Sequence, residues 1–108
     1  MATQYGDRDI SRNRRWGRVS MPIISIFFGI VIRINFFDHA PPHLHAAHGG
    51  REALFDITTG RVIVGALPRK ETRYVVEWIV RNRDELMRNW GLAVTGQPTF
   101  RIEGLADD

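Results

Sequence analysis

The sequence predicts an α+β domain, in which a small antiparallel sheet of about four or five strands carries one long amphipathic helix on one face. Between Pro22 and Val64, short segments rich in β-branched and aromatic residues alternate with Gly-rich or Pro-rich turns. From Pro68 to Trp90, apolar residues recur at spacings of three and four. Neither element can bury its apolar side alone, so we expect the helix to pack across the sheet.

The composition limits the chain to one modest domain. Its 108 residues suit a single core, and the absence of cysteine excludes both a disulfide framework and a thiolate metal site. Residues 1–20 contain five arginines and two aspartates, which account for the whole formal net charge of +3. We therefore expect residues 1–20 to form a disordered basic extension that touches nucleic acid only nonspecifically. Residues 21–96 should form the domain and residues 97–108 a loose tail.

No segment predicts contact with a membrane. The longest apolar run, residues 23–32, is interrupted by Ser25 and Gly29 and is about half of the ~20 residues that a spanning helix needs. Residues 1–20 also lack the apolar stretch of a signal peptide. We expect a soluble, cytoplasmic protein.

The first two strands are expected between Met21 and Phe36. Residues 23–28 form one short strand, and Gly29 bends the chain into the next. The β-branched and aromatic residues of the second strand place one alternating set on a single face: Ile30, Ile32, Ile34 and Phe36.

The remaining strands should continue an antiparallel meander. The Pro41-Pro42 pair supplies no backbone donors, so the second strand must end before it. Residues 43–48 are short enough to be an edge strand. Two glycines then turn the chain into a strand over residues 51–58, and Thr59-Gly60 turns it into a last strand over residues 61–64.

One long helix is expected after Pro68, which suits a first helical turn. Gly91 suits a left-handed cap that ends the helix. The apolar stripe is most simply core, and it consists of Tyr74, Val75, Trp78, Ile79, Leu86, Met87 and Trp90.

All four histidines of the chain lie within ten residues. His43 and His45 project to the same face of a strand, a spacing that suits two imidazoles on one metal ion. His39 or Asp38 would supply a third ligand from the preceding turn, while His48 would point to the opposite face. No cofactor is expected, with a divalent metal as the open alternative. In the other interpretation the segment is a structural turn, in which Asp38 accepts hydrogen bonds from backbone N–H groups.

Four short motifs in this region resemble those of one bacterial family. They are a Met-Pro-x-Ile-Ser start, a Gly-Ile-x-Ile strand, the string Asp-His-x-Pro-Pro-His-x-His, and a helix with Glu-Trp followed by Glu-Leu-x-x-x-Trp. The matching positions are Met21, Pro22, Ile24, Ser25, Gly29, Ile30, Ile32, Asp38, His39, Pro41, Pro42, His43, His45, Glu77, Trp78, Glu85, Leu86 and Trp90. Over about residues 21–96 the chain is similar to the proteins grouped as domain of unknown function 4160.

The resemblance implies a small bacterial protein that is often encoded beside another short protein, an arrangement associated with toxin–antitoxin pairs. It supplies no catalytic residues. Asn82 departs from the pattern, which has a histidine at that position, so the helix is not expected to donate a ligand to the histidine cluster.

Three functions follow from these observations. We expect first one half of a toxin–antitoxin-like pair, which binds a small cognate partner or a second copy through edge strands, namely the first strand and residues 43–48. The second is a metal-binding protein that uses His43 and His45.

The third function is a small ribonuclease-type toxin. Its acid–base group would be His43 or His45, with Glu52 as an alternative base. Its phosphate-binding groups would be chosen from Arg33, Arg51 and Arg69. The neutral charge of residues 21–108 counts against RNA attraction outside the basic extension.

Overall fold

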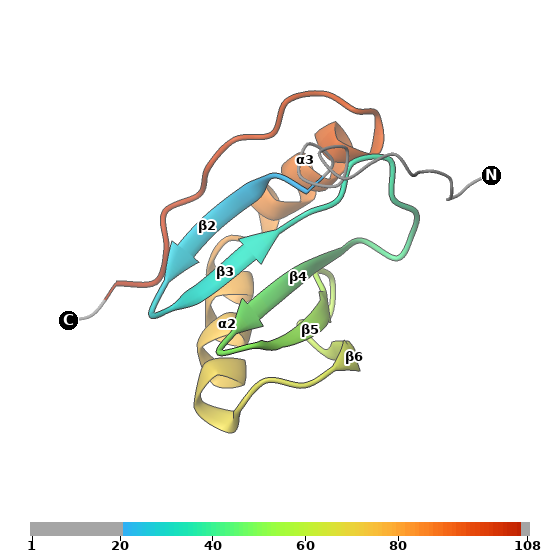
Figure 1. Cartoon of the computed structure of the whole chain (residues 1–108). Helices are drawn as coiled ribbons and strands as arrows, with labels where there is room; N and C mark the ends of the chain where they lie inside the picture. The colour runs from blue at the N-terminus through green and yellow to red at the C-terminus, as the bar shows by residue number, and fades with distance from the viewer. Residues whose placement is uncertain (1–20, 107–108) are drawn as a thin grey trace.

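The computed structural model describes residues 21–106. The predicted basic extension over residues 1–20 lies outside the described residues. The predicted α+β class is confirmed: a five-stranded antiparallel sheet carries its helices on one face (Figure 1). The strands are β2 (Ile23–Phe27), β3 (Ile30–Arg33), β4 (His43–His48), β5 (Arg51–Asp56) and β6 (Val62–Gly65), and they lie in that order across the sheet.

The turns that join the strands are those that the glycines predict. Phe28 and Gly29 both have positive φ between β2 and β3, and Gly49 and Gly50 both do so between β4 and β5. Such two-residue turns match the twist of the strands they connect. The second of them sets the register of the β4–β5 hairpin, with His48 opposite Arg51 and His45 opposite Leu54.

Two helices replace the one long helix that the apolar spacing predicts. They are α2 (Arg69–Arg81) and α3 (Arg83–Val94), and Asn82 lies between them with φ −124° and ψ 23°. The Asn82 side chain donates a hydrogen bond to the carbonyl oxygen of Trp78 at 2.9 Å. Asparagine competes for backbone groups in this way, and here it ends one helix while its own carbonyl accepts from Leu86 in the next.

The predicted end of the helix at Gly91 is wrong. Helix α3 runs on to Val94 because Ala93 continues the apolar stripe and is fully buried. The left-handed residue is Gly96, with φ +76°, and its N–H donates to the carbonyl oxygen of Ala93 at 3.0 Å.

The core lies between the sheet and the two helices. Ile30, Ile32 and Ile34 are fully buried, as the alternation along β3 predicts. The helices contribute Val75, Trp78, Ile79, Leu86 and Trp90 from the predicted stripe, while Met87 remains 37% exposed.

The expectation that residues 43–48 form an edge strand is wrong. Strand β4 is the central strand, paired with β3 on one side and β5 on the other. A meander of five strands places its third member in the middle. The Pro-Pro pair separates β3 from β4 by a loop, and β4 is still paired on both sides.

The segment after α3 is packed, in contrast to the loose tail expected over residues 97–108. It runs along the outer side of β2 (Figure 1), where the N–H of Ile102 donates to the carbonyl oxygen of Ile24 at 2.9 Å. Ile102 is 5% exposed. The indole N–H of Trp78 donates to the carbonyl oxygen of Glu103 at 2.9 Å. This C-terminal strap, residues 99–106, covers the β2 edge of the sheet.

Within residues 21–106, no helix is both long and apolar enough to cross a membrane.

Candidate functional site

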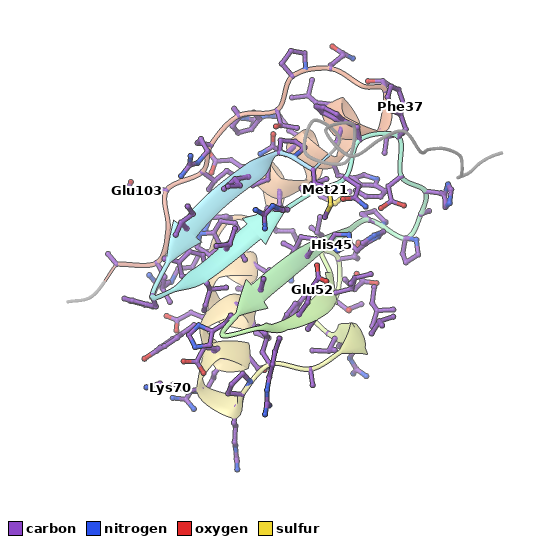
Figure 2. All side chains as sticks on the ribbon, viewed as in Figure 1. Met21, Phe37, His45, Glu52, Lys70 and Glu103 are labelled. Atoms are coloured by element: carbon purple, nitrogen blue, oxygen red, sulfur yellow. The ribbon has the colours of Figure 1, made fainter. Side chains whose placement is uncertain are left out.

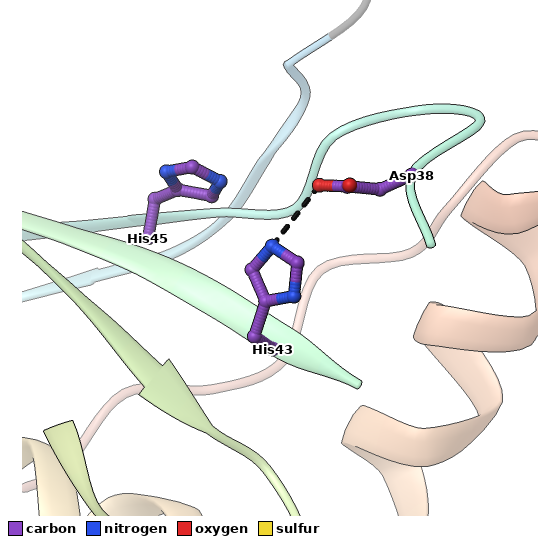
Figure 3. A group of neighbouring side chains, drawn as sticks. All are labelled: Asp38, His43 and His45. Atoms are coloured by element: carbon purple, nitrogen blue, oxygen red, sulfur yellow. Dashed lines mark ion pairs between the residues drawn. The ribbon is translucent and has the colours of Figure 1, made fainter. Parts of the chain in front are cut away.

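Asp38 and His43 form an ion pair where the β3–β4 loop meets the start of β4. The Oδ2 atom of Asp38 lies 3.0 Å from Nε2 of His43 (Figure 3). The other ring nitrogen of His43, Nδ1, lies 2.7 Å from the carbonyl oxygen of Pro41. A carbonyl oxygen only accepts, so Nδ1 of His43 carries the proton and Nε2 is the atom that faces Asp38.

His45 is held in the same manner by the neighbouring strand. Its Nδ1 lies 3.2 Å from Oε2 of Glu52 on β5. Both side chains lie on the face of the sheet turned away from the helices (Figure 2). The hairpin register makes Ala47 the direct partner of Glu52, so the Glu52 carboxylate reaches His45 diagonally. The remaining nitrogen of His45, Nε2, is buried and has no hydrogen-bond partner among the described residues.

The two histidines and Asp38 bring potential ligand atoms close together. One ligand atom from each of Asp38, His43 and His45 lies within 4.8 Å of the others. The two imidazole rings are 5.5 Å apart between centroids, and the indole of Trp90 packs 5.2 Å from the ring of His43. The three side chains are between 10% and 18% exposed, so the cluster is sheltered without being sealed from solvent.

The electrostatics of the cluster differ between its two histidines. The hydrogen bond to Asp38 raises the pKa of His43, against the opposing effect of burial. Burial lowers the pKa of His45, and the nearby Glu52 carboxylate offsets this only in part. Burial acts to raise the pKa of Asp38, but the hydrogen bonds from His43 and from the His39 N–H outweigh it and leave that pKa lowered. At neutral pH, His45 therefore offers an unprotonated Nε2 to a ligand.

The other predicted site residues differ in their position relative to this cluster. Arg33 lies directly opposite His45 in the β3–β4 register and shares its face. His39 is exposed, and only its backbone N–H contacts Asp38. His48 points to the helix side, as predicted, where its Nε2 lies 3.5 Å from Glu71 and its Nδ1 lies 3.1 Å from the carbonyl oxygen of Gly29.

Two predicted phosphate-binding residues lie away from the cluster. Arg51 pairs with His48 at the far end of the hairpin, and Arg69 begins α2 on the other side of the sheet. The ribonuclease hypothesis therefore retains His43, His45, Glu52 and Arg33, and it stays a prediction.

Two residues that contact His43 are not predicted by the sequence. The carbonyl oxygen of Pro41 orients His43, and Trp90 packs on its ring, whereas the helix stripe predicts only a core role for that indole. The signal for Pro41 is its position two residues before a strand histidine, which places a free carbonyl within reach of the ring. No sequence signal links Trp90 to His43, because the contact depends on how α3 crosses the sheet.

The Asp38–His43 pair predicts a pH-dependent stability in the metal-free protein. His43 has a raised folded pKa, so its contribution is complete below the unfolded value of 6.5 and is lost as pH rises through the folded value. Asp38 has a lowered folded pKa, so its contribution is present above 3.8 and is lost as pH falls through the folded value. We expect Asp38→Asn to destabilise the domain more at about pH 5.5 than at about pH 8.5, measured by urea unfolding in chelator.

The exposed Glu77–Arg81 pair supplies the control for this measurement. Glu77→Gln should have a small effect that is the same at both pH values, because surface pairs contribute little. Equal effects of Asp38→Asn at the two pH values would contradict the assigned charge states.

Fold and site together define a small α+β protein with a sheltered histidine–aspartate cluster at the start of the central strand of its sheet. The chain belongs to the family described as a domain of unknown function, DUF4160, whose model matches residues 29–91. The match includes all four residues of the cluster and its support, Asp38, His43, His45 and Glu52, and it confirms the predicted resemblance. No curated protein and no solved structure matches the chain.

Proposed function

We propose that this protein binds a divalent transition-metal ion through Asp38, His43 and His45. One observation carries the proposal: both imidazoles are oriented through Nδ1 by an acceptor, while one ligand atom of each lies within 4.8 Å of the other and of a carboxylate oxygen of Asp38. Histidines that ligate metals are typically held through their other nitrogen by a carboxylate or a backbone carbonyl. The partnerless Nε2 of His45 supports the proposal further, because a buried acceptor without a partner is costly.

The ligand set defines the class of metal. Two imidazoles and one carboxylate suit zinc, iron or manganese, whereas calcium and magnesium prefer oxygen ligands. Three protein ligands leave at least one coordination position for water or a small ligand. At that position a bound metal would lower the pKa of a water molecule, with Arg33 on the same face to attract an anion.

A zinc titration tests the proposal. Calorimetry on chelator-treated protein near neutral pH should show one Zn²⁺ bound per chain, and binding should be lost in His45→Ala. Glu52→Ala should weaken binding by about 10–100-fold, because Glu52 orients a ligand without being one. Wild-type protein should also gain about 2.7 kcal/mol of unfolding free energy when free zinc is about 100 times the dissociation constant.

His48→Ala is the matched control, since it removes a histidine of the same strand that points to the other face. It should leave zinc binding unchanged, as should the exposed His39→Ala. Absence of saturable binding, or equal loss in His45→Ala and His48→Ala, would remove the metal assignment.

A second function is favoured by an open sheet edge. We propose that the protein also engages a protein partner, in keeping with one half of a bacterial, cytoplasmic toxin–antitoxin-like pair. Within residues 21–106, strand β6 has no neighbour on its outer side, whereas the C-terminal strap covers β2. A short strand with unpaired backbone groups is a common site for strand addition. Co-purification with the product of an adjacent gene, unaffected by chelator, is the expected result.

A further inference from the structure

Strand β6 exposes an unusual run of apolar side chains. Val62, Ile63 and Val64 are 40%, 45% and 56% exposed, and residues 61–66 are all exposed. Edge strands usually carry a lysine, a proline or a covering segment that prevents pairing with another chain. None of these protects β6 in the described part of the chain. Its outer backbone groups are therefore available for hydrogen bonds to an added strand.

A hollow on the surface of α2 lies near the turn that leads into β6. A Cβ atom on Gly60, in the β5–β6 turn, would lie 3.8 Å from Val76 of α2. Arg69, Thr72, Arg73 and Val76 share one face of α2 and line a surface hollow. The start of β6 therefore lies close to this face of α2.

The hollow is positively charged. Arg69 and Arg73 line it, and Arg61 directly precedes β6. Among the described residues, no acidic side chain lies within ion-pair distance of these three arginines. The neighbouring carboxylates of α2 are already paired, Glu71 with His48 and Glu77 with Arg81.

We propose that β6 and the neighbouring hollow on α2 dock an extended, acidic segment of a partner protein, which adds to β6 as a sixth strand. The exposed valines and Ile63 would contact alternate apolar side chains of that segment, and the three arginines would pair with its carboxylates. A second copy of this chain fits less well, because two β6 strands side by side would bring two sets of arginines together. The inference specifies the partner of the protein-binding function and is independent of the metal site.

Fluorescence anisotropy with labelled ten-residue peptides tests the proposal on the full chain. The first peptide alternates valine with glutamate, the second alternates valine with lysine, and the third is the acidic peptide with alternate backbone amides methylated. The acidic peptide should bind, the methylated peptide should bind at least about tenfold more weakly, and the lysine peptide should not bind. Charge reversal by Arg69→Glu with Arg73→Glu should weaken the acidic peptide about tenfold or more and create binding to the lysine peptide.

The reversal of peptide preference shows that the variant still folds. The matched control is Arg88→Glu with Arg101→Glu, which changes the net charge equally at exposed sites on α3 and the C-terminal strap. This control should keep the wild-type affinity. Failure of the acidic peptide to bind, equal binding of all three peptides, or a dimer that Val64→Lys disrupts would each overturn the proposed partner.

Discussion

Trp78→Ala should lower the free energy of unfolding by about 3–5 kcal/mol, measured by urea denaturation. Trp78 is fully buried, and its ring packs 5.1 Å from the ring of Phe27 across the interface between α2 and the sheet. Its indole N–H also holds the carbonyl oxygen of Glu103. The substitution removes a large ring from a close-packed core and releases the strap at the same time.

Two further variants separate these effects. Trp78→Phe keeps a phenyl ring but loses the rest of the indole and its hydrogen bond, so it should cost less than Trp78→Ala, about 1–3 kcal/mol. Val80→Ala is the control on the same helix, because Val80 is 57% exposed and its truncation should change stability by less than about 0.5 kcal/mol. A wild-type denaturation midpoint for Trp78→Ala would show that the ring is not a core element.

The fold is predictable where a local rule decides it. Alternation predicts the buried face of β3, and paired glycines predict the β4–β5 turn. The helix break is harder to predict, because Ile79 and Leu86 keep a seven-residue spacing that continues through Asn82. The break depends on one side chain that competes for the carbonyl oxygen of Trp78. Hydrophobic periodicity does not register such a competition.

The candidate site is predictable in part for the same reason. The two-residue period of a strand places His43 and His45 on one face, and Asp38 reaches His43 from the adjacent loop. The contact of Glu52 with His45 follows from the two-residue turn, since counting outward from Gly49-Gly50 sets the register. The contact of Trp90 with His43 does not follow from any local rule. It is determined by the packing of α3, which is a tertiary property.

Removal of the C-terminal strap by a stop codon after Pro98 should destabilise the domain by about 4 kcal/mol or more. Burial of one isoleucine side chain such as Ile102 is worth about 1.5–3 kcal/mol. The deletion also leaves the fully buried Asn89 without its partners, since its amide donates to the Phe100 carbonyl oxygen at 2.8 Å and accepts from the Phe100 N–H at 2.9 Å. Each buried polar group left unpaired costs about 1–3 kcal/mol.

Such a loss approaches the total stability of a small domain, about 5–15 kcal/mol, so thermal unfolding should broaden or shift to a much lower midpoint. Exposure of the β2 edge should also increase association, visible by light scattering. Ile102→Ala should reproduce about 2–4 kcal/mol of the effect, while Arg101→Ala, at an exposed neighbouring position, should have little effect. Full retention of stability after the deletion would show that β2 needs no cover and that the strap is dispensable to the core.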